Sequence, residues 1–294
     1  MATRVMLDVD TGIDDALALL YAVAHPDLDL VAVSCVSGNV GLSQVVRNTC
    51  SVLDIAGGGS VPVGSGADMT LMGVGARAGH KHGANGLGDL AVSASIRQVQ
   101  QDSAVDLLRE AIRQADSSVT LAALGPQTNI AMLVRDRRED IASSIDNLIL
   151  VSGRLGHADE PAEFNVGHDP EAAAIVLGSG LPITMYGPEV LNRVTVSEAS
   201  IDNLVQHDHP AIRLAGKLLR VRHGRLIGDA GALVMLTDPG LFSAQPIHLR
   251  IGLRNEERGR ILLDPAAFLI NVVTAVKADR ASERFVGVLQ SYAN

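Results

Sequence analysis

The segment Leu7-Asp8-Val9-Asp10-Thr11-Gly12-Ile13-Asp14-Asp15 decides the fold of this chain. An apolar run at residues 5–9 predicts a buried strand, and the run at residues 13–24 predicts a helix that begins with carboxylates. A strand that leads through a short turn into a helix is the repeating element of parallel sheets. The segment therefore predicts an α/β protein.

The same alternation continues along the chain. Further strands are predicted at residues 28–36, 119–124, 148–151 and 181–185, and further helices at residues 42–56, 103–115, 128–135 and 170–177. These strands are continuously apolar, which is typical of a parallel sheet with helices on both faces. We therefore expect one domain over residues 1–294, with an open, mostly parallel, Rossmann-like sheet. Its last third, residues 197–294, is expected to be more helical, with a surface excursion near residues 250–260 and a final helix at residues 265–276.

The composition limits the kind of ligand. The 294 residues carry a formal net charge of −9, so the chain has no basic stripe for a phosphate backbone, and we expect no nucleic-acid partner. A small neutral ligand, or a cation bound by carboxylates, suits this charge better. Aromatic residues make up only 2% of the chain and Trp is absent, so few aromatic faces are available for a flat heteroaromatic ligand.

Cysteine content and the N-terminus bear on the compartment. Cys35 and Cys50 are too few for a disulfide framework. The N-terminal residues run directly into a strand without the apolar region of a signal peptide, and no apolar stretch is long enough to cross a membrane. We therefore expect a cytoplasmic protein without a membrane partner.

Three carboxylates gather after the first predicted strand. Ligands of open α/β sheets bind beyond the carboxyl ends of the strands, which is where Asp10, Asp14 and Asp15 lie. The helix N-terminus favours negative charge by about 1 kcal/mol at most, and repulsion between the carboxylates costs more. A bound cation resolves this repulsion, and ligands that are all oxygen favour Ca²⁺ or Mg²⁺ over Zn²⁺. The alternative is an acidic helix cap with solvated charges.

The string DVDTGIDDALAL, residues 8–19, resembles the N-terminal signature of the inosine/uridine-preferring nucleoside hydrolases. Further similar segments follow in the same order at residues 37–40, 82–88, 124–131, 161–165 and 169–173. The resemblance implies a nucleoside hydrolase-like fold, a homodimer or homotetramer, and Ca²⁺ as the cofactor. It also implies hydrolysis of the N-glycosidic bond of a ribonucleoside to ribose and free base.

The resemblance assigns roles to individual residues. It implies that Asp10 and Asp15, the backbone carbonyl of Leu124 and Asp229 bind Ca²⁺, and that Asp10 is also the general base that activates water. For Asp229 the alternative is a plain N-cap of the following helix. The residues expected to bind the sugar are Asp14, Asn39, Glu163 and Asn165.

The sequence departs from the family pattern at several positions. Gly228 stands where a histidine that protonates the leaving base is usual, so His82, in a glycine-rich loop, or His223 is expected to take that role. For His223 the alternative is a solvated histidine at a helix end. His157 replaces a ribose-binding Asn, and Val151 replaces a Met beneath the sugar. Purine and pyrimidine nucleosides, and a non-standard ribosyl compound, all stay open as substrates.

Two other functions are compatible with parts of the sequence. The string Asp8-Val9-Asp10-Thr11 resembles the start of the haloacid-dehalogenase-type phosphatase motif, in which the first Asp is the nucleophile. A catalytically impaired protein that binds ribose or a nucleoside on the same scaffold is the other alternative, suggested by Gly228 and His157. Release of phosphate from phosphoesters would indicate the first, and saturable binding without turnover the second.

Overall fold

The computed structural model describes residues 2–75, 80–97, 99–155 and 161–293. The strands in these ranges are β1 Thr3–Val9, β2 Leu28–Cys35, β3 Val63–Ser65, β4 Gln100–Ser103, β5 Val119–Ala123, β6 Ile145–Val151, β7 Ile183–Tyr186, β8 Phe242–Ile251, β9 Ile261–Leu263 and β10 Phe268–Val276. The helices are α1 Ile13–Ala24, α2 Leu42–Ala56, α3 Ala104–Arg113, α4 Thr128–Ala142, α5 Phe164–His168, α6 Pro170–Leu177, α7 Pro188–Leu191, α8 Glu198–Gln206, α9 Pro210–Val221, α10 Ala230–Thr237 and α11 Ala278–Gln290.

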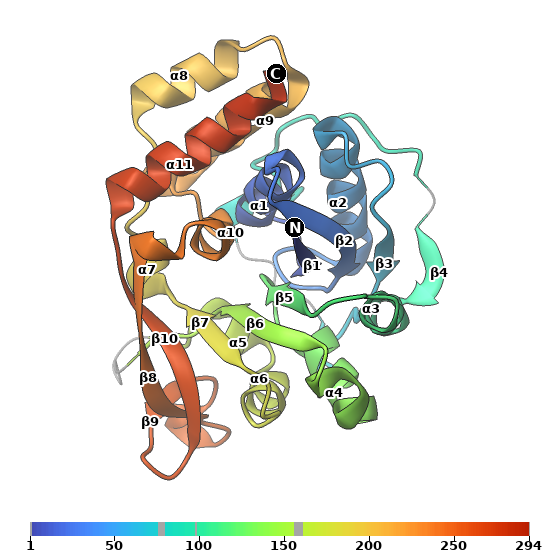
Figure 1. Cartoon of the computed structure of the whole chain (residues 1–294), viewed down its shortest axis with the longest axis vertical. Coiled ribbons are helices and arrows are strands. Elements are labelled where there is room, and N and C mark those ends of the chain that lie inside the picture. Colours follow the sequence, from blue (N-terminus) through green and yellow to red (C-terminus); the bar gives the residue numbers. More distant parts are fainter. Residues whose placement is uncertain (1, 76–79, 98, 156–160, 294) are drawn as a thin grey trace.

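The described strands form one sheet in the order β4-β3-β2-β1-β5-β6-β7-β10-β8-β9. Every neighbouring pair from β4 to β10 is parallel, and only β8 and β9 run antiparallel to their neighbours. The fold is therefore the mostly parallel α/β sheet that the sequence predicts. Figure 1 shows β1 near the middle of the sheet, with the antiparallel strands at one edge.

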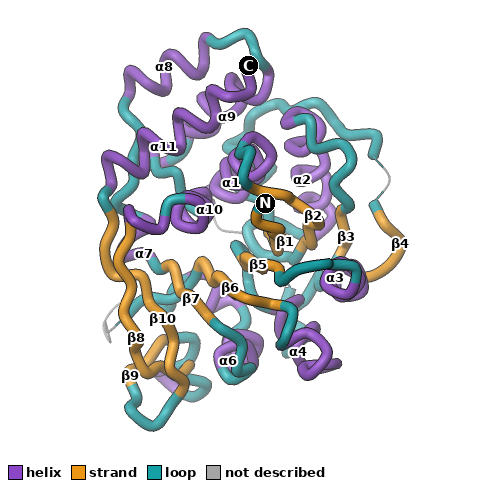
Figure 2. Tube along the Cα trace, in the orientation of Figure 1, coloured by secondary structure: helices purple, strands orange, loops and turns teal. Residues whose placement is uncertain are grey.

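Helices cover both faces of the sheet (Figures 1 and 2). One apolar cluster joins the sheet to α1, α2, α9, α10 and α11, and a second cluster joins it to α3, α4 and α6. Strand β1 contributes to both, because Leu7 points into the first cluster and Met6 into the second, as the two-residue period of a strand requires. Burial of residues 5–9 on both faces explains why this part of β1 is apolar apart from Asp8.

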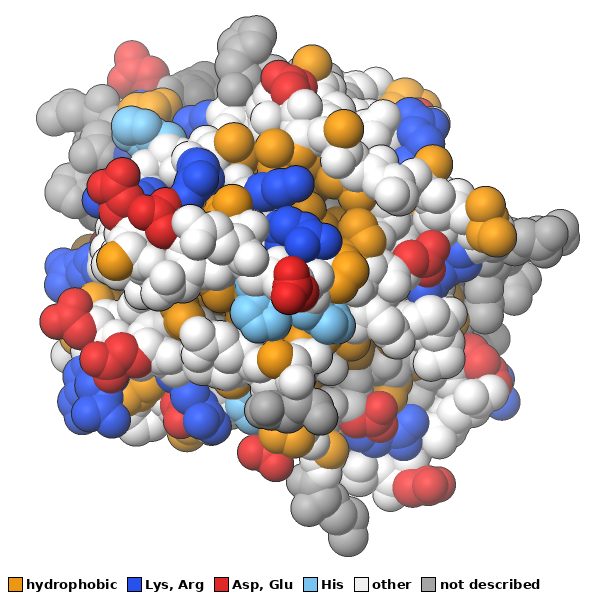
Figure 3. All heavy atoms as spheres, turned by 90° about the horizontal axis from the view of Figure 1, so that it is seen from above, with side chains coloured by type: hydrophobic (Ala, Val, Ile, Leu, Met, Phe, Trp, Pro, Cys, Tyr) orange, Lys and Arg blue, Asp and Glu red, His pale blue; other side chains and the backbone are white. Residues whose placement is uncertain are grey.

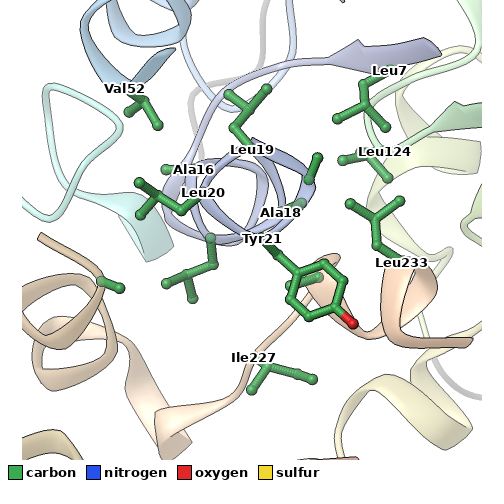
Figure 4. Packing of buried hydrophobic residues seen from close by; sticks show 14 of the residues in the cluster. Leu7, Ala16, Ala18, Leu19, Leu20, Tyr21, Val52, Leu124, Ile227 and Leu233 are labelled. Atoms are coloured by element: carbon green, nitrogen blue, oxygen red, sulfur yellow. The ribbon is translucent and has the colours of Figure 1, made fainter. Parts of the chain in front are cut away.

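Helix α1 lies inside the molecule and not on its surface. Residues Ile13–Ala22 are all buried, and α1 packs against α2, α9, α10 and α11. Figure 4 shows Leu19, Leu20 and Tyr21 of this helix among side chains from other elements, including Ile227 and Leu233. Because α1 is enclosed on all sides, the carboxylates in its first turn have fixed positions.

The sequence-based assignment of the C-terminal third is wrong at one element. Residues 268–276, inside the expected final helix, form strand β10, and the final long helix is α11 at residues 278–290. Residues 270–273, three of which are β-branched, pair with β8, and Asn271 and Val272 also pair with β7. The excursion near residues 250–260 is the turn between the antiparallel strands β8 and β9. This third therefore contains three strands in addition to the helices α8, α9, α10 and α11.

Within the described ranges, no helix combines the length and the apolar character that crossing a membrane requires.

Candidate active site

Asp10 lies at the carboxyl edge of the sheet, directly after β1. The loops after the neighbouring strands β2 and β5 place Gly38 and Gly125 against it. A Cβ on Gly38 would collide with the Asp10 carboxylate, and a Cβ on Gly125 would lie 3.0 Å from Asp10 Oδ1. Glycine at both positions therefore makes room for this buried carboxylate between the two loops.

Backbone N–H groups orient Asp10 and Asp15. The N–H of Asn39 donates to Asp10 Oδ2 at 2.7 Å, which fixes the rotation of that carboxylate. Asp15 accepts from the N–H of Asp10 at 3.2 Å and from the N–H of Gly12 at 2.9 Å, as the reciprocal half of a helix cap. The turn from β1 into α1 thus holds both predicted metal ligands in place.

Asp229 is not a plain helix cap. It precedes α10, but its backbone is helical and its side chain makes no cap hydrogen bond. Burial raises the pKa of Asp229 well above its ordinary value, and the charges of Asp15, Asp14 and Asp10 raise it further. The alternative role as an N-cap is therefore wrong, and Asp229 belongs to the same electrostatic neighbourhood as the carboxylates of the first turn.

Ionisation of all four aspartates, Asp10, Asp14, Asp15 and Asp229, would place more negative charge in this site than the one ion pair with Arg222 neutralises. Burial, followed by the charge of Asp15, raises the pKa of Asp10 well above its usual range. Burial is also the main cause that raises the pKa of Asp15 to about 6. Carboxylates that repel one another in a desolvated site favour a proton or a bound cation.

Asp14 is paired with a residue that the sequence analysis did not identify. Arg222, just after α9, donates from Nε to Asp14 Oδ1 at 2.6 Å and from Nη2 to Asp14 Oδ2 at 2.7 Å. The side chains of Arg222 and Asp14 are only 11% and 10% exposed, so this fork-to-fork ion pair is largely desolvated. In the sequence, Arg222 stands out only because it precedes His223, and this position does not indicate that Arg222 pairs with a residue of α1.

Gly228 packs directly on Asp14. Its φ of +56° lies in the left-handed region, and a Cβ there would overlap the Asp14 carboxyl group. The histidine that is usual at this position would not fit here, because the Asp14 carboxylate fills the space in which its side chain would begin.

Of the two candidate histidines, the structure brings only His82 to the carboxylates. Its Nδ1 accepts from the N–H of Ile13 at 3.0 Å, so the neutral ring carries its proton on Nε2. Burial lowers the pKa of His82 below its ordinary value. His223, in contrast, is exposed in the short 3₁₀ turn His223–Arg225. Figure 3 shows imidazole and Lys or Arg side chains around a carboxylate near the centre of the upper face.

The two predicted sugar ligands after β6 make local hydrogen bonds in this structure. Glu163 is the N-cap of α5 and accepts from the N–H groups of Gly153 and Asn165 at 2.9 and 3.0 Å. Asn165 Nδ2 donates to the carbonyls of Leu124 and Val151, at 2.7 Å in both cases. Asn165 thereby positions the Leu124 carbonyl, the predicted backbone ligand of the metal. His157, the other predicted sugar ligand, lies outside the described residues.

Further buried polar groups at this edge have no hydrogen-bond partner among the described residues. They are Ser37 Oγ after β2, both amide atoms of Gln127 after β5, and the hydroxyl of Tyr186 at the end of β7. Sequence reasoning missed Gln127 and Tyr186. Buried polar atoms without partners are rare in proteins and are usually satisfied by water, an ion or a ligand.

A cation fits this donor set, although the side chains do not converge on one point. In the described part of the chain, no three His, Cys, Asp or Glu side chains form a ready-made metal cluster. Asp14 is bound by Arg222 and Asp15 by backbone N–H groups, which accounts for the lack of convergence. The excess negative charge and the Tyr186 hydroxyl, which lies close enough to feel the charge of Asp229, nevertheless fit a cation with oxygen ligands.

Comparison with known proteins identifies the family to which the chain belongs. Residues 5–283 match the family described as inosine-uridine preferring nucleoside hydrolase. The chain belongs to this family. The nucleoside hydrolase is 34% identical over 269 residues to the pyrimidine-specific ribonucleoside hydrolase RihA of Shewanella sp. strain MR-7, covering 87% of this chain and 84% of the relative. It is 32% identical to RihA of Photobacterium profundum over 87% of this chain and 86% of that relative.

Solved structures agree with this assignment. The purine-preferring ribonucleoside hydrolase from Gardnerella vaginalis superposes with a TM-score of 0.92 at 25% identity and covers 99% of both chains. An inosine-guanosine nucleoside hydrolase, at 23% identity and a TM-score of 0.87, shows the same fold over 99% of this chain and 98% of its own.

The phosphatase alternative is wrong. Asp8, its required nucleophile, is fully buried, and its Oδ1 accepts from Ser34 Oγ at 2.5 Å and from Asn129 Nδ2 at 2.8 Å. A carboxylate enclosed in this way cannot attack a phosphoester.

Proposed function

We propose that this nucleoside hydrolase cleaves the N-glycosidic bond of a ribonucleoside to ribose and free base, with Ca²⁺ bound by Asp10, Asp15, Asp229 and the Leu124 carbonyl. The observation that supports it is the group of buried aspartates at the carboxyl edge of the sheet, whose negative charge Arg222 neutralises only in part. Carboxylate and carbonyl oxygens suit Ca²⁺ better than Zn²⁺.

Each residue of the site has a separate task in this reaction. Calcium, when bound, supplies a polarised water and a contact for sugar hydroxyls. Asp10 accepts the proton of the attacking water, and the N–H of Asn39 keeps its carboxylate from rotating away. Glycosidic cleavage builds positive charge on the sugar, which the nearby carboxylates stabilise.

The remaining residues bind the sugar and assist the leaving base. Asp14, Asn39, Asn165, Glu163 and His157 are the proposed sugar-binding set. His82 is the better candidate than His223 for the leaving base, because it is buried next to the carboxylates and its Nε2–H is free to donate. Since burial keeps the pKa of His82 low, we propose that the neutral ring stabilises the departing base by a hydrogen bond.

For the base, we propose a pyrimidine. The support is the 34% identity to relatives named as pyrimidine-specific, which exceeds the 25% identity to the purine-preferring enzyme. A homodimer or homotetramer stays a prediction from the family resemblance.

Release of reducing sugar from uridine, cytidine, inosine and guanosine tests the proposal. The wild-type chain is expected to release ribose from uridine or cytidine, to lose this activity in EGTA and to regain it with added calcium. Asp10→Asn should abolish turnover, whereas Asp29→Asn, on a carboxylate whose side chain is 56% exposed, should not change it. Saturable uridine binding without ribose release would instead identify a nucleoside-binding protein.

A further inference from the structure

The Arg222–Asp14 ion pair connects two distant parts of the chain at the predicted cation site. The partners are 208 residues apart, and the bidentate contact joins the first turn of α1 to the connection between α9 and α10. Exposed ion pairs contribute little to stability, but in a largely desolvated pair each charge depends on its partner. Loss of the guanidinium would leave Asp14 as an unpaired buried carboxylate.

Arg222 also acts beyond Asp14. Its guanidinium also lies near the buried carboxyl group of Asp229. Of the four aspartates, Asp14 and Asp229 lie near this one guanidinium, while Asp10 and Asp15 accept hydrogen bonds from backbone N–H groups. Among the described residues, Arg222 is the one cationic side chain hydrogen-bonded to this group.

The α9–α10 connection is shaped to allow this pairing. The backbone of Gly228 passes so close to Asp14 that any side chain there would displace the carboxylate from the guanidinium. The departure from the family pattern at position 228 therefore leaves room for the Asp14 carboxylate to pair with Arg222.

We propose that Arg222 is a positioning residue that serves as an internal counter-cation: it pairs with Asp14 when no metal is bound and thereby weakens the binding of calcium to the neighbouring carboxylates. This inference rests on the proposed calcium site. Its physical basis is that a fixed positive charge repels a divalent cation and compensates part of the negative charge that would attract it.

The proposal predicts opposite changes in stability and in calcium affinity. Arg222→Met removes the charge and keeps much of the apolar stem. In EGTA the variant should melt at a lower temperature than the wild type, because Asp14 loses its partner. Its affinity for calcium should rise about tenfold, which corresponds to about 1.4 kcal/mol, because no fixed cation competes.

Isothermal titration of calcium into the chelator-treated, full-length chain measures this change. The matched control is Arg225→Met, three residues further on, which removes the same charge from an arginine that is 49% exposed and pairs with Glu198. Its calcium affinity should stay within about twofold of the wild type, because solvent and salt screen that charge. Arg222→Lys keeps the charge and should bind calcium about as weakly as the wild type.

Melting temperatures separate this role from a structural one. The destabilisation by Arg222→Met should be large in EGTA and should shrink in saturating calcium. Equal destabilisation with and without calcium would mean that the pair only holds the fold, and would overturn the proposal. If Arg222→Met does not fold, Arg222→Gln, which retains hydrogen-bond donors without the charge, is titrated in its place and should show the same rise in affinity.

The remaining outcomes are also decisive. Calcium affinity that is unchanged or weaker in Arg222→Met, or equally raised in Arg222→Lys, overturns the role as counter-cation, even if the wild type binds calcium and releases ribose. If neither the wild type nor any Arg222 variant binds calcium, the metal site of the proposed function is refuted as well, and the ribose-release assay then shows whether hydrolysis survives without it.

Discussion

Asn165 offers a quantitative test of how the Leu124 carbonyl is held. Its Nδ2 donates to the carbonyls of Leu124 and Val151 at 2.7 Å in a buried position, so Asn165→Ala leaves two acceptors without a donor. Each buried acceptor left unpaired costs about 1 to 3 kcal/mol, so the two acceptors together give a loss of about 2 to 6 kcal/mol in the free energy of unfolding. A domain with more than about 6 kcal/mol of stability, within the usual range of about 5 to 15 kcal/mol, should still fold.

Urea unfolding of the metal-free protein, followed by circular dichroism, measures this loss. With a slope of about 3 kcal/mol per molar urea, the midpoint should fall by about 0.7 to 2 M. Asn165→Asp should be at least as unstable at neutral pH, because its carboxylate would face two carbonyl oxygens. The control is Asn147→Ala, whose half-buried side chain accepts one hydrogen bond from Thr184 Oγ1 at 3.0 Å and should cost about 1 kcal/mol or less.

Repeating the unfolding in calcium tests the proposed metal ligand at the same time. If calcium binds the Leu124 carbonyl, it satisfies one of the two acceptors, and the loss for Asn165→Ala should fall by up to half. A loss in EGTA no larger than that of Asn147→Ala would refute the hydrogen-bond reasoning. A full loss in EGTA that calcium leaves unchanged would remove the Leu124 carbonyl from the ligand set.

Three further changes test other parts of the site. Asp229→Asn should raise the melting temperature in EGTA, because it removes a buried carboxylate that repels the neighbouring ones. The same change should weaken calcium binding at least tenfold in calorimetry. A lower melting temperature in EGTA would contradict the electrostatic argument. Gly228→Ala should cost at least about 2 kcal/mol in urea unfolding, because of its positive φ and the collision with Asp14, and a loss below about 0.5 kcal/mol would show that Asp14 moves aside freely. His82→Ala should slow the hydrolysis of uridine more than that of p-nitrophenyl riboside, whose leaving group needs less assistance. His223→Ala, at an exposed histidine, should slow the hydrolysis of both substrates only slightly. Equal slowing of both substrates by His82→Ala would exclude a role for His82 at the leaving base.

The C-terminal strand shows where local patterns mislead. Residues 268–276 and the α helices both carry apolar side chains at short intervals, and a short apolar run does not distinguish a strand from a buried helix. Its pairing with β7 and β8 decides the matter, and those partners lie far away in the sequence. The helices at residues 42–56 and 170–177, in contrast, begin and end at the predicted residues, because each lies between glycine or turn residues.

The sequence alone determined the turn from β1 into α1, because the contacts that shape it are local: Asp15 accepts from the N–H groups of Gly12 and Asp10 within five residues. It also determined the family, through motifs in a fixed order along the chain. Only the tertiary structure decided which charges meet. Asp14 and Arg222 carry no local signal for each other, and they pair because the packing of α9 and α10 on α1 brings positions 208 residues apart into contact. A buried carboxylate pairs with the cationic side chain that the fold places beside it, and the sequence near Asp14 does not show which side chain this is.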